Sequence, residues 1–360
     1  MKRRICINEI ADYSKGQQIN GDDLLADGKY DYLNGGINPS GKWSDYNVEG
    51  GTVTISEGGN SSGYVNYMNS PFWCGAHCYY LYNVKGNTRY LYYALKSQQD
   101  KLMGIRSGAC MPNIKKSDLG KFEVWFDTDI NEQVKVIEVL EKVENIIQAR
   151  KRQLEAFDQL IKARFVEMFG DPELNPMGWE QVTLNDVCSS IVRGPFGSAL
   201  KKEFFVEPDE TTYKVYEQKH AIQKSASIGT YYITEEKYQE LKRFECLPGD
   251  ILMSCSGTMG ELYQLPDGCE KGVINQALCK FTLNERILPI CFLVYMKQTI
   301  GNLETKGSGI QNIAAVSYVK QMPINLPPMD VQNEFEQFVH QVDKSKVAVQ
   351  KALDEAQQLF

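Results

Sequence analysis

Long apolar runs, catalytic motifs and paired metal-ligand motifs are all missing from this 360-residue sequence. No run of about 18 apolar residues is present, which argues against a membrane-spanning helix. The basic residues at the start of the chain, Lys2 to Arg4, are followed by no apolar segment, so we expect no secretory signal and a cytoplasmic protein. The 10 cysteines are scattered along the chain, as is typical of free thiols in a reducing compartment.

The sequence also lacks the usual signatures of enzymes. It has no glycine-rich phosphate loop, no dinucleotide-binding motif, no H-E-x-x-H helix and no nucleophile elbow. The three histidines, His77, His220 and His340, lie far apart. The only tight cysteine cluster, Cys74 to Cys78, lacks both the C-x₂-C spacing and a second ligand pair of a zinc site. We therefore expect no catalytic residue, no metal and no cofactor in this chain.

The charge balance is acidic, with 39 basic and 46 acidic residues and a net charge of −7. A simple nucleic-acid-binding domain carries the opposite sign. Affinity for DNA depends on local patches, however. Any DNA-binding surface must therefore be a concentrated patch on a neutral or acidic body.

The chain contains an internal repeat, which also suits a length of two ordinary domains. When the two halves are aligned, the loop at 107–113 falls on the loop at 306–312, and Gln133 falls on Gln332. With small gaps, residues 7–10 match 184–187, and 51–56 match 249–254. Several matches in the same order are difficult to obtain by chance.

Each half ends in a long heptad-patterned segment, and apolar residues recur at steps of four and three. A first helix of about 39 residues would be about 58 Å long, which is longer than one domain is wide. We therefore predict that the two helices pair within the chain, in preference to pairing between chains. Lys346 is a polar residue in the seam, and we expect it to set the register. The predicted seam residues are Val136, Leu140, Val143, Ile147, Leu154, Phe157, Ile161, Phe335, Val339, Val342, Lys346, Val349 and Leu353.

The rest of the chain predicts strands, because β-branched and aromatic residues cluster in short runs between Gly, Asn and Asp. Examples of predicted strands are 52–55, 213–216, 230–233 and 251–253, and predicted helices cover 88–99 and 235–243. The predicted fold class is α+β, with two similar β-rich recognition domains, two long antiparallel coiled-coil helices and a pseudo-two-fold repeat. The predicted bounds are 1–130 for the first domain, 131–170 for the first spacer helix, 171–328 for the second domain and 329–360 for the second spacer helix.

Polar loops rich in Gly, Ser, Asn and Gln let a backbone approach DNA and offer hydrogen-bonding groups to base edges. Loops that recur in both halves carry more weight than single loops, which are more often ordinary solvated turns. The candidate DNA-binding residues are Ser56, Asn60, Ser61, Arg106, Asn113, Arg193, Lys214, Lys219, Ser256, Lys306, Ser308 and Gln311.

Two stretches resemble a known family. Phe169-Gly170-Asp171-Pro172, followed by Asn175-Pro176 and Gly178-Trp179, is similar to the entry into the second recognition domain of specificity (S) subunits of type I restriction–modification systems. The run from Pro323 to Gln332, with Leu326-Pro327-Pro328, resembles the start of the family's second long helix. The first half lacks these prolines and keeps Glu132-Gln133. The resemblance covers nearly the whole chain.

The resemblance implies two target recognition domains that each read half of a split DNA site, at a spacing set by an antiparallel coiled coil. It implies a non-catalytic subunit that binds double-stranded DNA and docks methyltransferase subunits and, in a full complex, restriction subunits. S-adenosylmethionine, ATP and Mg would belong to those partners. Helices of about 45–58 Å predict a target that spans about 13–17 base pairs.

Two alternatives remain at this point. The acidic balance is also compatible with a two-lobed coiled-coil scaffold or inhibitor that binds only proteins. A self-contained nuclease or methyltransferase is disfavoured, because its motifs are missing.

Overall fold

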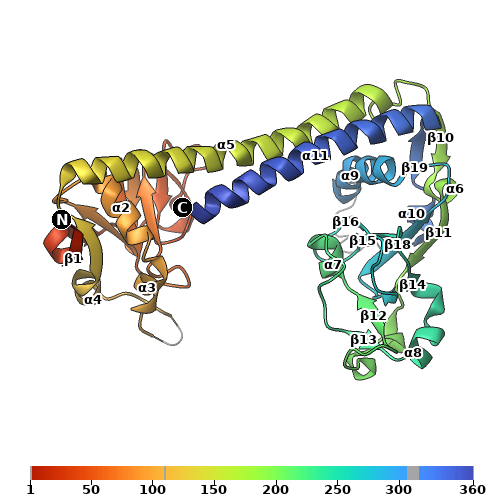
Figure 1. Ribbon diagram of the computed structural model, residues 1–360, viewed down its shortest axis with the longest axis horizontal. Helices are drawn as coiled ribbons and strands as arrows, with labels where there is room; N and C mark the ends of the chain where they lie inside the picture. The colour runs from red at the N-terminus through yellow and green to blue at the C-terminus, as the bar shows by residue number, and fades with distance from the viewer. Residues whose placement is uncertain (1, 109–110, 306–315, 360) are drawn as a thin grey trace. The chain divides into compact units, whose positions relative to one another are not determined.

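The computed structural model describes residues 2–108, 111–305 and 316–359. The chain forms two compact units, Met1–Ala149 with Glu355–Phe360, and Arg150–Asp354. Each unit contains one β-rich domain and parts of two long helices, α5 (Ile130–Phe169) and α11 (Met329–Leu359) (Figure 1). Among the described residues, no helix combines the length and apolarity that crossing a membrane requires.

The first domain is built on a four-stranded antiparallel sheet of order β2-β8-β5-β6, whose apolar face is buried. A second sheet, of order β4-β3-β7, contains the parallel pair β3 and β7, and β1 pairs with β9. The elements are β1 (Lys2–Cys6), α1 (Ile7–Ile10), β2 (Asp12–Lys15), η1 (Gly21–Asp23), β3 (Tyr30–Leu33), β4 (Gly41–Trp43), β5 (Thr52–Ser56), β6 (Val65–Met68), β7 (Phe72–Cys74), β8 (Cys78–Tyr82), α2 (Thr88–Lys96), α3 (Gln99–Gly104), α4 (Lys116–Lys121) and β9 (Glu123–Asp127).

The second domain has a four-stranded antiparallel sheet of order β11-β18-β15-β16 and a mixed sheet of order β13-β12-β17-β14. Strand β10 pairs with β19. The elements are β10 (Glu180–Thr183), α6 (Leu184–Val187), β11 (Cys188–Arg193), η2 (Gly197–Ala199), η3 (Lys202–Phe204), β12 (Tyr213–Tyr216), α7 (Gln218–Ile222), β13 (Tyr232–Ile233), α8 (Glu235–Glu240), η4 (Lys242–Phe244), β14 (Glu245–Cys246), β15 (Ile251–Ser254), β16 (Leu262–Gln264), β17 (Gly272–Ile274), β18 (Leu278–Leu283), α9 (Pro289–Thr305), α10 (Val316–Lys320) and β19 (Pro323–Leu326).

The two domains repeat one topology. In each four-stranded sheet, the strand that comes first in the chain, β2 or β11, pairs with the strand that comes last, β8 or β18. That last strand also pairs with β5 or β15, the first strand of a β-hairpin. In each, the second sheet contains one parallel pair, β3 with β7 or β12 with β17, whose first strand also pairs antiparallel with β4 or β13. The internal repeat seen in the sequence is therefore a repeat of the fold.

Local sequence signals account for several elements. Asn87 caps α2, and its side chain accepts hydrogen bonds from the backbone N–H groups of Arg89 and Tyr90 at 2.8 and 3.4 Å. Thr234 caps α8 in the same way. Both helices lie where the sequence predicts them, although each ends three residues early, at Lys96 and Glu240. The predicted strands at 52–55, 213–216 and 251–253 are confirmed, and the one at 230–233 is shortened to Tyr232–Ile233.

The first turns of α5 pack on the first domain rather than in a seam with another helix. Ile137 and Leu140 contact the core of that domain, and Gln133 is fully buried. Val136 points away and is 40% exposed, so its prediction as a seam residue was wrong. Compared with the heptad pattern, the buried face of this part of α5 is shifted by one residue, from Val136 to Ile137. The reason is that the domain core, not a second helix, covers it.

Within the second unit, the last part of α5 runs antiparallel to α11. Arg164 pairs with Glu334 at 2.8 Å, and Asp158, which precedes Arg164 in α5, pairs with Lys346, further along α11, at 2.6 Å. Phe335 packs edge-on against Phe165 and Phe169, with ring centroids 5.5 and 5.2 Å apart. Other seam positions of this unit are buried or half-buried: Leu154, Phe157, Ile161, Val339, Val342, Val349 and Leu353. In the first unit, Val143 is half-buried and Ile147 is buried.

A buried glutamine near the start of each long helix ties that helix to its domain. The Gln133 amide oxygen accepts from the Asn87 N–H at 2.8 Å, and its nitrogen donates to the Asp127 carbonyl at 2.6 Å. Gln332 accepts from the Leu288 N–H at 2.8 Å and donates to two carbonyls. Both side chains are fully buried. Each amide therefore joins a long helix to the N-terminal end of the domain helix, α2 or α9, and to the chain segment that precedes the long helix.

We predict that Gln332→Leu lowers the free energy of unfolding by about 2–4 kcal/mol. Leucine would remove the hydrogen-bond partner of the Leu288 N–H and of the carbonyls of Arg286 and Pro327, of which the Pro327 carbonyl bond is buried. Urea denaturation measures the loss. Gln337→Leu is the matched control, because Gln337 lies exposed on the same helix and its replacement should change stability by less than about 0.5 kcal/mol. Equal effects of the two changes would contradict the anchoring role.

We predict that Lys346→Leu raises the free energy of unfolding by about 0.5–1 kcal/mol. The ion pair with Asp158 is partly exposed and contributes little, whereas leucine would add apolar contact in the seam. Lys344→Leu, at an exposed position of the same helix, should give no increase. A destabilised Lys346→Leu chain would show that the ion pair contributes more than the seam contact.

Candidate nucleic-acid interface

Two predicted DNA-binding loops of the first domain lie together. Gly58 forms a backbone bridge with Asn113, and the Gly59 N–H donates to the Pro112 carbonyl at 2.9 Å. The Arg106 guanidinium donates to the Asn60 carbonyl at 3.4 Å. The side chains of Asn60, Arg106 and Asn113 are exposed. We call Asn60, Ser61, Arg106 and Asn113 the first loop surface.

The two serines of this region hold the loop in place. The hydroxyls of Ser56 and Ser61 both donate to the Gly35 carbonyl, the second at 2.7 Å. Ser56 is 2% exposed. The sequence-based choice of Ser56 as a DNA-contacting residue was therefore wrong, because its hydroxyl is buried at the end of β5. Ser61 is half-buried, and its hydroxyl is likewise directed to the chain itself.

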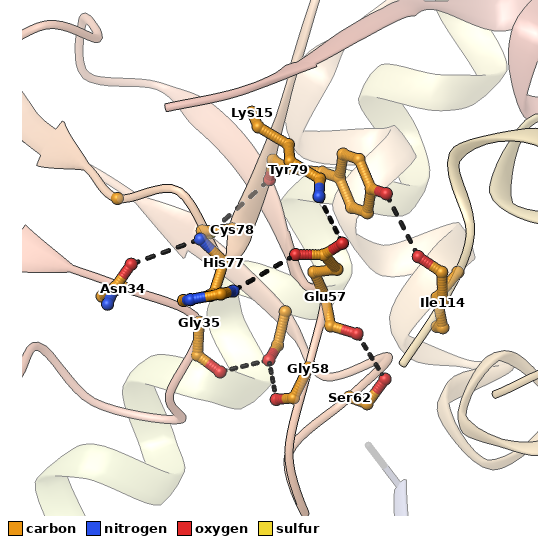
Figure 2. Close-up of polar contacts among 12 residues, drawn as sticks. Lys15, Asn34, Gly35, Glu57, Gly58, Ser62, His77, Cys78, Tyr79 and Ile114 are labelled. Atoms are coloured by element: carbon orange, nitrogen blue, oxygen red, sulfur yellow. Dashed lines mark hydrogen bonds and ion pairs between the residues drawn. The ribbon is translucent and has the colours of Figure 1, made fainter. Parts of the chain in front are cut away.

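A charged cluster around Glu57 borders the first loop surface (Figure 2). The Glu57 carboxylate pairs with Lys15 on one side and lies 3.4 Å from His77 Nδ1 on the other. Its backbone carbonyl accepts from the Ser62 hydroxyl at 2.6 Å and from the Ile114 N–H at 2.9 Å. The cluster thus joins the end of β2, the loop after β5 and the segment before α4.

In the second domain, the residue Arg193 ends β11 and lies against an exposed aromatic ring. Its guanidinium lies 4.9 Å from the Phe196 ring centroid, and its Nε donates to the Gln276 carbonyl at 3.4 Å. Phe196 is 62% exposed, the most exposed Phe ring among the described residues. Arg193 itself is mostly covered, so the part of this pair that faces solvent is the Phe196 side chain.

Lys214 lies inside the second domain and not on its surface. It sits on β12, is 1% exposed and pairs with Glu270 at 2.8 Å. Its prediction as a DNA-binding residue was wrong, because β12 is buried from Lys214 to Tyr216. The Lys214 ammonium group is covered and pairs with the exposed Glu270 carboxylate.

Two other predicted residues of the second domain lie close together. Helix α7 carries Gln218 and Lys219, and the Gln218 amide donates to the carbonyls of Ser256 and Thr258. Lys219 is half-exposed and pairs with Glu217 at 2.6 Å. We call Lys219, Ser256 and Thr258 the second loop surface. Lys306, Ser308 and Gln311 lie outside the described residues.

Sequence reasoning missed Lys15. The signal was available, because Lys15 and Arg193 end the corresponding strands β2 and β11 of the repeat and a glycine follows each. The alignment of 7–10 with 184–187 did not reach this position, since a register shift between Cys188 and Ser190 adds one residue to β11.

The structure also shows the surroundings of the tight cysteine cluster. A hydrogen bond with the Cys78 thiol, together with burial, raises the pKa of Cys74. His77 is directed to Glu57 instead of to the two thiols (Figure 2). No group of three or more side chains in the described part of the chain is arranged to hold a metal ion.

His220 fixes the start of α7 from within the protein. Its Nδ1 accepts from the Glu217 N–H at 2.8 Å, and its Nε2 donates to the Ile228 carbonyl at 2.7 Å. Burial lowers the pKa of His220 below its usual value of 6.5, and nearby Lys214 contributes in the same direction. The neutral imidazole therefore holds the helix that carries Gln218 and Lys219.

Comparison with known proteins gives a consistent picture. A family model described as the type I restriction modification DNA specificity domain matches residues 3–156 and 176–356. A protein of Mycoplasma genitalium, named as a type I specificity subunit, is 33% identical over 147 residues, which are 39% of this chain and 38% of that protein. One of Mycoplasma pneumoniae, named likewise, is 34% identical over 130 residues, 35% of this chain and 34% of that protein. The chain thus spans less than two fifths of the length of these two relatives.

Solved structures share the fold. The crystal structure of a type I restriction–modification S subunit from M. genitalium has a TM-score of 0.58 at 20% identity, and covers 100% of this chain and 94% of its own. A chain from a structure on complex assembly of a type I restriction–modification system has a TM-score of 0.61 at 14% identity, with 99% and 95% covered. At these identities the likeness concerns the fold alone.

We predict that stability falls as the pH drops below about 6.5, and that His220 contributes to this loss. A histidine whose pKa is lowered by folding stabilises the protein above its unfolded pKa, and this stabilisation disappears as the pH falls toward the folded pKa. Urea denaturation at pH 7.5 and 5.5 should show a smaller pH effect in His220→Gln than in the unmodified chain. His340→Gln, at an exposed position on α11, should keep the full effect. An undiminished pH effect in His220→Gln would refute the assignment.

Proposed function

The chain belongs to the family of type I restriction–modification DNA specificity domains, and we propose that it directs a methyltransferase to a split DNA target. Residues 1–130 and 171–328 are the two recognition domains in this proposal, and 131–170 and 329–360 are the spacer helices. The chain itself is not a catalyst. Base methylation requires the target adenine to leave the helical stack, and the pocket that accepts it belongs to the methyltransferase partner.

One observation carries the proposal: a single topology occurs twice, and each copy is anchored to a long helix through an equivalent buried glutamine. Two copies of one reader suit a target made of two half-sites. In each copy, polar loops and a basic strand-end residue lie at the end of the four-stranded sheet, next to the β5–β6 or β15–β16 connection. On these surfaces the exposed Arg106 and the half-exposed Lys219 are the basic groups open to a duplex, since Arg193 is covered and Lys15 pairs with Glu57.

The long helices suit a spacer. Helix α5 has 40 residues and α11 has 31, so they are about 60 and 46 Å long. The antiparallel pairing seen in the second unit is compatible with a pseudo-two-fold arrangement of the two readers. We infer a bipartite target of about 14–18 base pairs, at about 3.4 Å per pair, whose centre is not read.

The proposed contacts in the first domain are Asn60, Ser61, Arg106 and Asn113. In the second domain they are Arg193, Lys219 and Ser256, together with Lys306, Ser308 and Gln311. S-adenosylmethionine, ATP and Mg would be bound by methyltransferase and restriction partners. The partners in this proposal are double-stranded DNA, methyltransferase subunits and, in a full complex, restriction subunits.

We expect the full chain, together with the methyltransferase of its own system, to select a bipartite site from random duplexes. Binding should weaken steeply between 50 and 200 mM salt, since phosphate contacts release counterions. Arg106→Ala should reduce the slope of log affinity against log salt by about one. Sequencing of selected duplexes and adenine-methylation mapping measure the site.

Two results would overturn the proposal. One is the selection of a single short contiguous site from the random duplexes. The other is the absence of salt-dependent duplex binding alongside stable protein complexes, which would favour the protein-binding scaffold that the net charge of −7 leaves open.

A further inference from the structure

The two domains share one turn at the same place in their four-stranded sheets. Lys15 is the last residue of β2 and pairs with Tyr79 of β8. Arg193 is the last residue of β11 and pairs with Cys279 of β18. The next residue is glycine in both copies, and its N–H donates to the carbonyl of Cys78 or Leu278, at 3.4 and 3.0 Å. The two turns are therefore equivalent by register and by hydrogen bonding.

Only glycine fits at this turn. A Cβ atom on Gly16 would lie 1.8 Å from the Cys74 carbonyl oxygen, and one on Gly194 would lie 1.9 Å from the Asn275 carbonyl oxygen. Both obstacles are backbone atoms, which a side-chain rearrangement cannot move. The chain must therefore leave the sheet at the same point and in the same way in both domains.

The basic residue before each glycine is held firmly. Lys15 pairs with the Glu57 carboxylate, and its ammonium lies 5.5 Å from the Tyr79 ring centroid. Arg193 is held by the Gln276 carbonyl and the Phe196 ring. We call residues 15–18 and 193–196 the strand-exit segments. The first adjoins the loop after β5 through the Lys15–Glu57 pair.

The two residues after the glycine differ completely between the copies. They are Gln17-Gln18 in the first domain and Pro195-Phe196 in the second. The side chains of Gln18 and Phe196 are exposed, Phe196 to 62%. A rigid turn thus presents different chemistry at the same point of each domain.

We propose that the strand-exit segments contact DNA bases and that Gln18 and Phe196 determine specificity. This inference rests on the proposed function. A glutamine amide can donate to and accept from the major-groove edge of adenine. A phenylalanine ring can contact the thymine methyl group or insert as a wedge between base steps. Each domain reads its own half-site through this position.

The test uses the full chain and its methyltransferase in selection from random duplexes, with the unmodified chain, Phe196→Ala, Phe196→Gln and Gln18→Ala. Phe196→Ala should lower preference at one half-site by about five- to tenfold, and leave the other half-site and the spacer unchanged. Phe196→Gln should change which base is preferred at that same half-site. Gln18→Ala should affect the opposite half-site only.

The matched control is Tyr318→Ala. Tyr318 lies on α10 of the same domain and is 57% exposed, so its removal tests whether any exposed aromatic has the effect. It should leave both half-sites unchanged. Urea denaturation should show that all variants fold, because each replaced side chain is exposed.

The outcomes separate this inference from the proposed function. If the unmodified chain selects a bipartite site and both Phe196 variants select the same site with the same preference, the inference is wrong and the proposed function stands. The same holds if Tyr318→Ala has an equal effect. If the unmodified chain selects no site, both are overturned.

Discussion

The buried amides of Gln133 and Gln332 are the contacts on which the rest of the architecture depends. Apolar packing and polar contacts such as Arg89 and Tyr93 with Glu144 also hold a long helix on its domain, and the buried amides add a directional constraint on its rotation. An amide with a backbone donor on one side and backbone carbonyls on the other allows one rotation only, since any slip leaves buried groups without partners. The same residue performs this task in both units, so each long helix meets its own domain through the same contacts.

The anchored helix fixes the position of one end of each domain. Backbone pairing in the sheets then fixes the positions of the loops relative to that helix. In the first domain, β1 pairs with β9, which leads directly into α5, and Ile7 to Ala11 connect β1 to the four-stranded sheet. The loop after β5 then meets the segment at 111–114 through backbone hydrogen bonds. A continuous series of backbone contacts therefore joins the helix to the first loop surface. Side chains on such a surface have fixed positions, which sequence-specific base contacts require.

The order of domains and long helices could be predicted because it follows from periodic patterns in the sequence. Heptad spacing predicts both long helices, and the repeat places equivalent strands in both halves.

The errors have one physical origin, since which face of an element is covered depends on its neighbours. Val136 fits the heptad pattern, but the domain core covers Ile137 instead. Ser56 and Lys214 are polar residues that look like surface groups, yet the first is buried and hydrogen-bonds to Gly35, and the second is covered while its ammonium group reaches the exposed Glu270. Lys15 escaped notice because its role appears only when β2 is aligned with β11.

The shared turn after β2 and β11 suggests how one framework can read different sequences. The glycine cannot change, because a backbone carbonyl occupies the space of its side chain in both copies. The strand before it cannot shift, since its register with β8 or β18 sets which faces are buried. Variation is therefore least costly two residues beyond the glycine, at Gln18 and Phe196, where the side chains are exposed. A change from Gln18 to a ring such as that of Phe196 costs little stability, but it replaces a hydrogen-bonding group with an apolar one at a fixed point. Because the glycine turn is fixed and the exposed residue two positions later can change, the DNA specificity of each domain can change without loss of the fold.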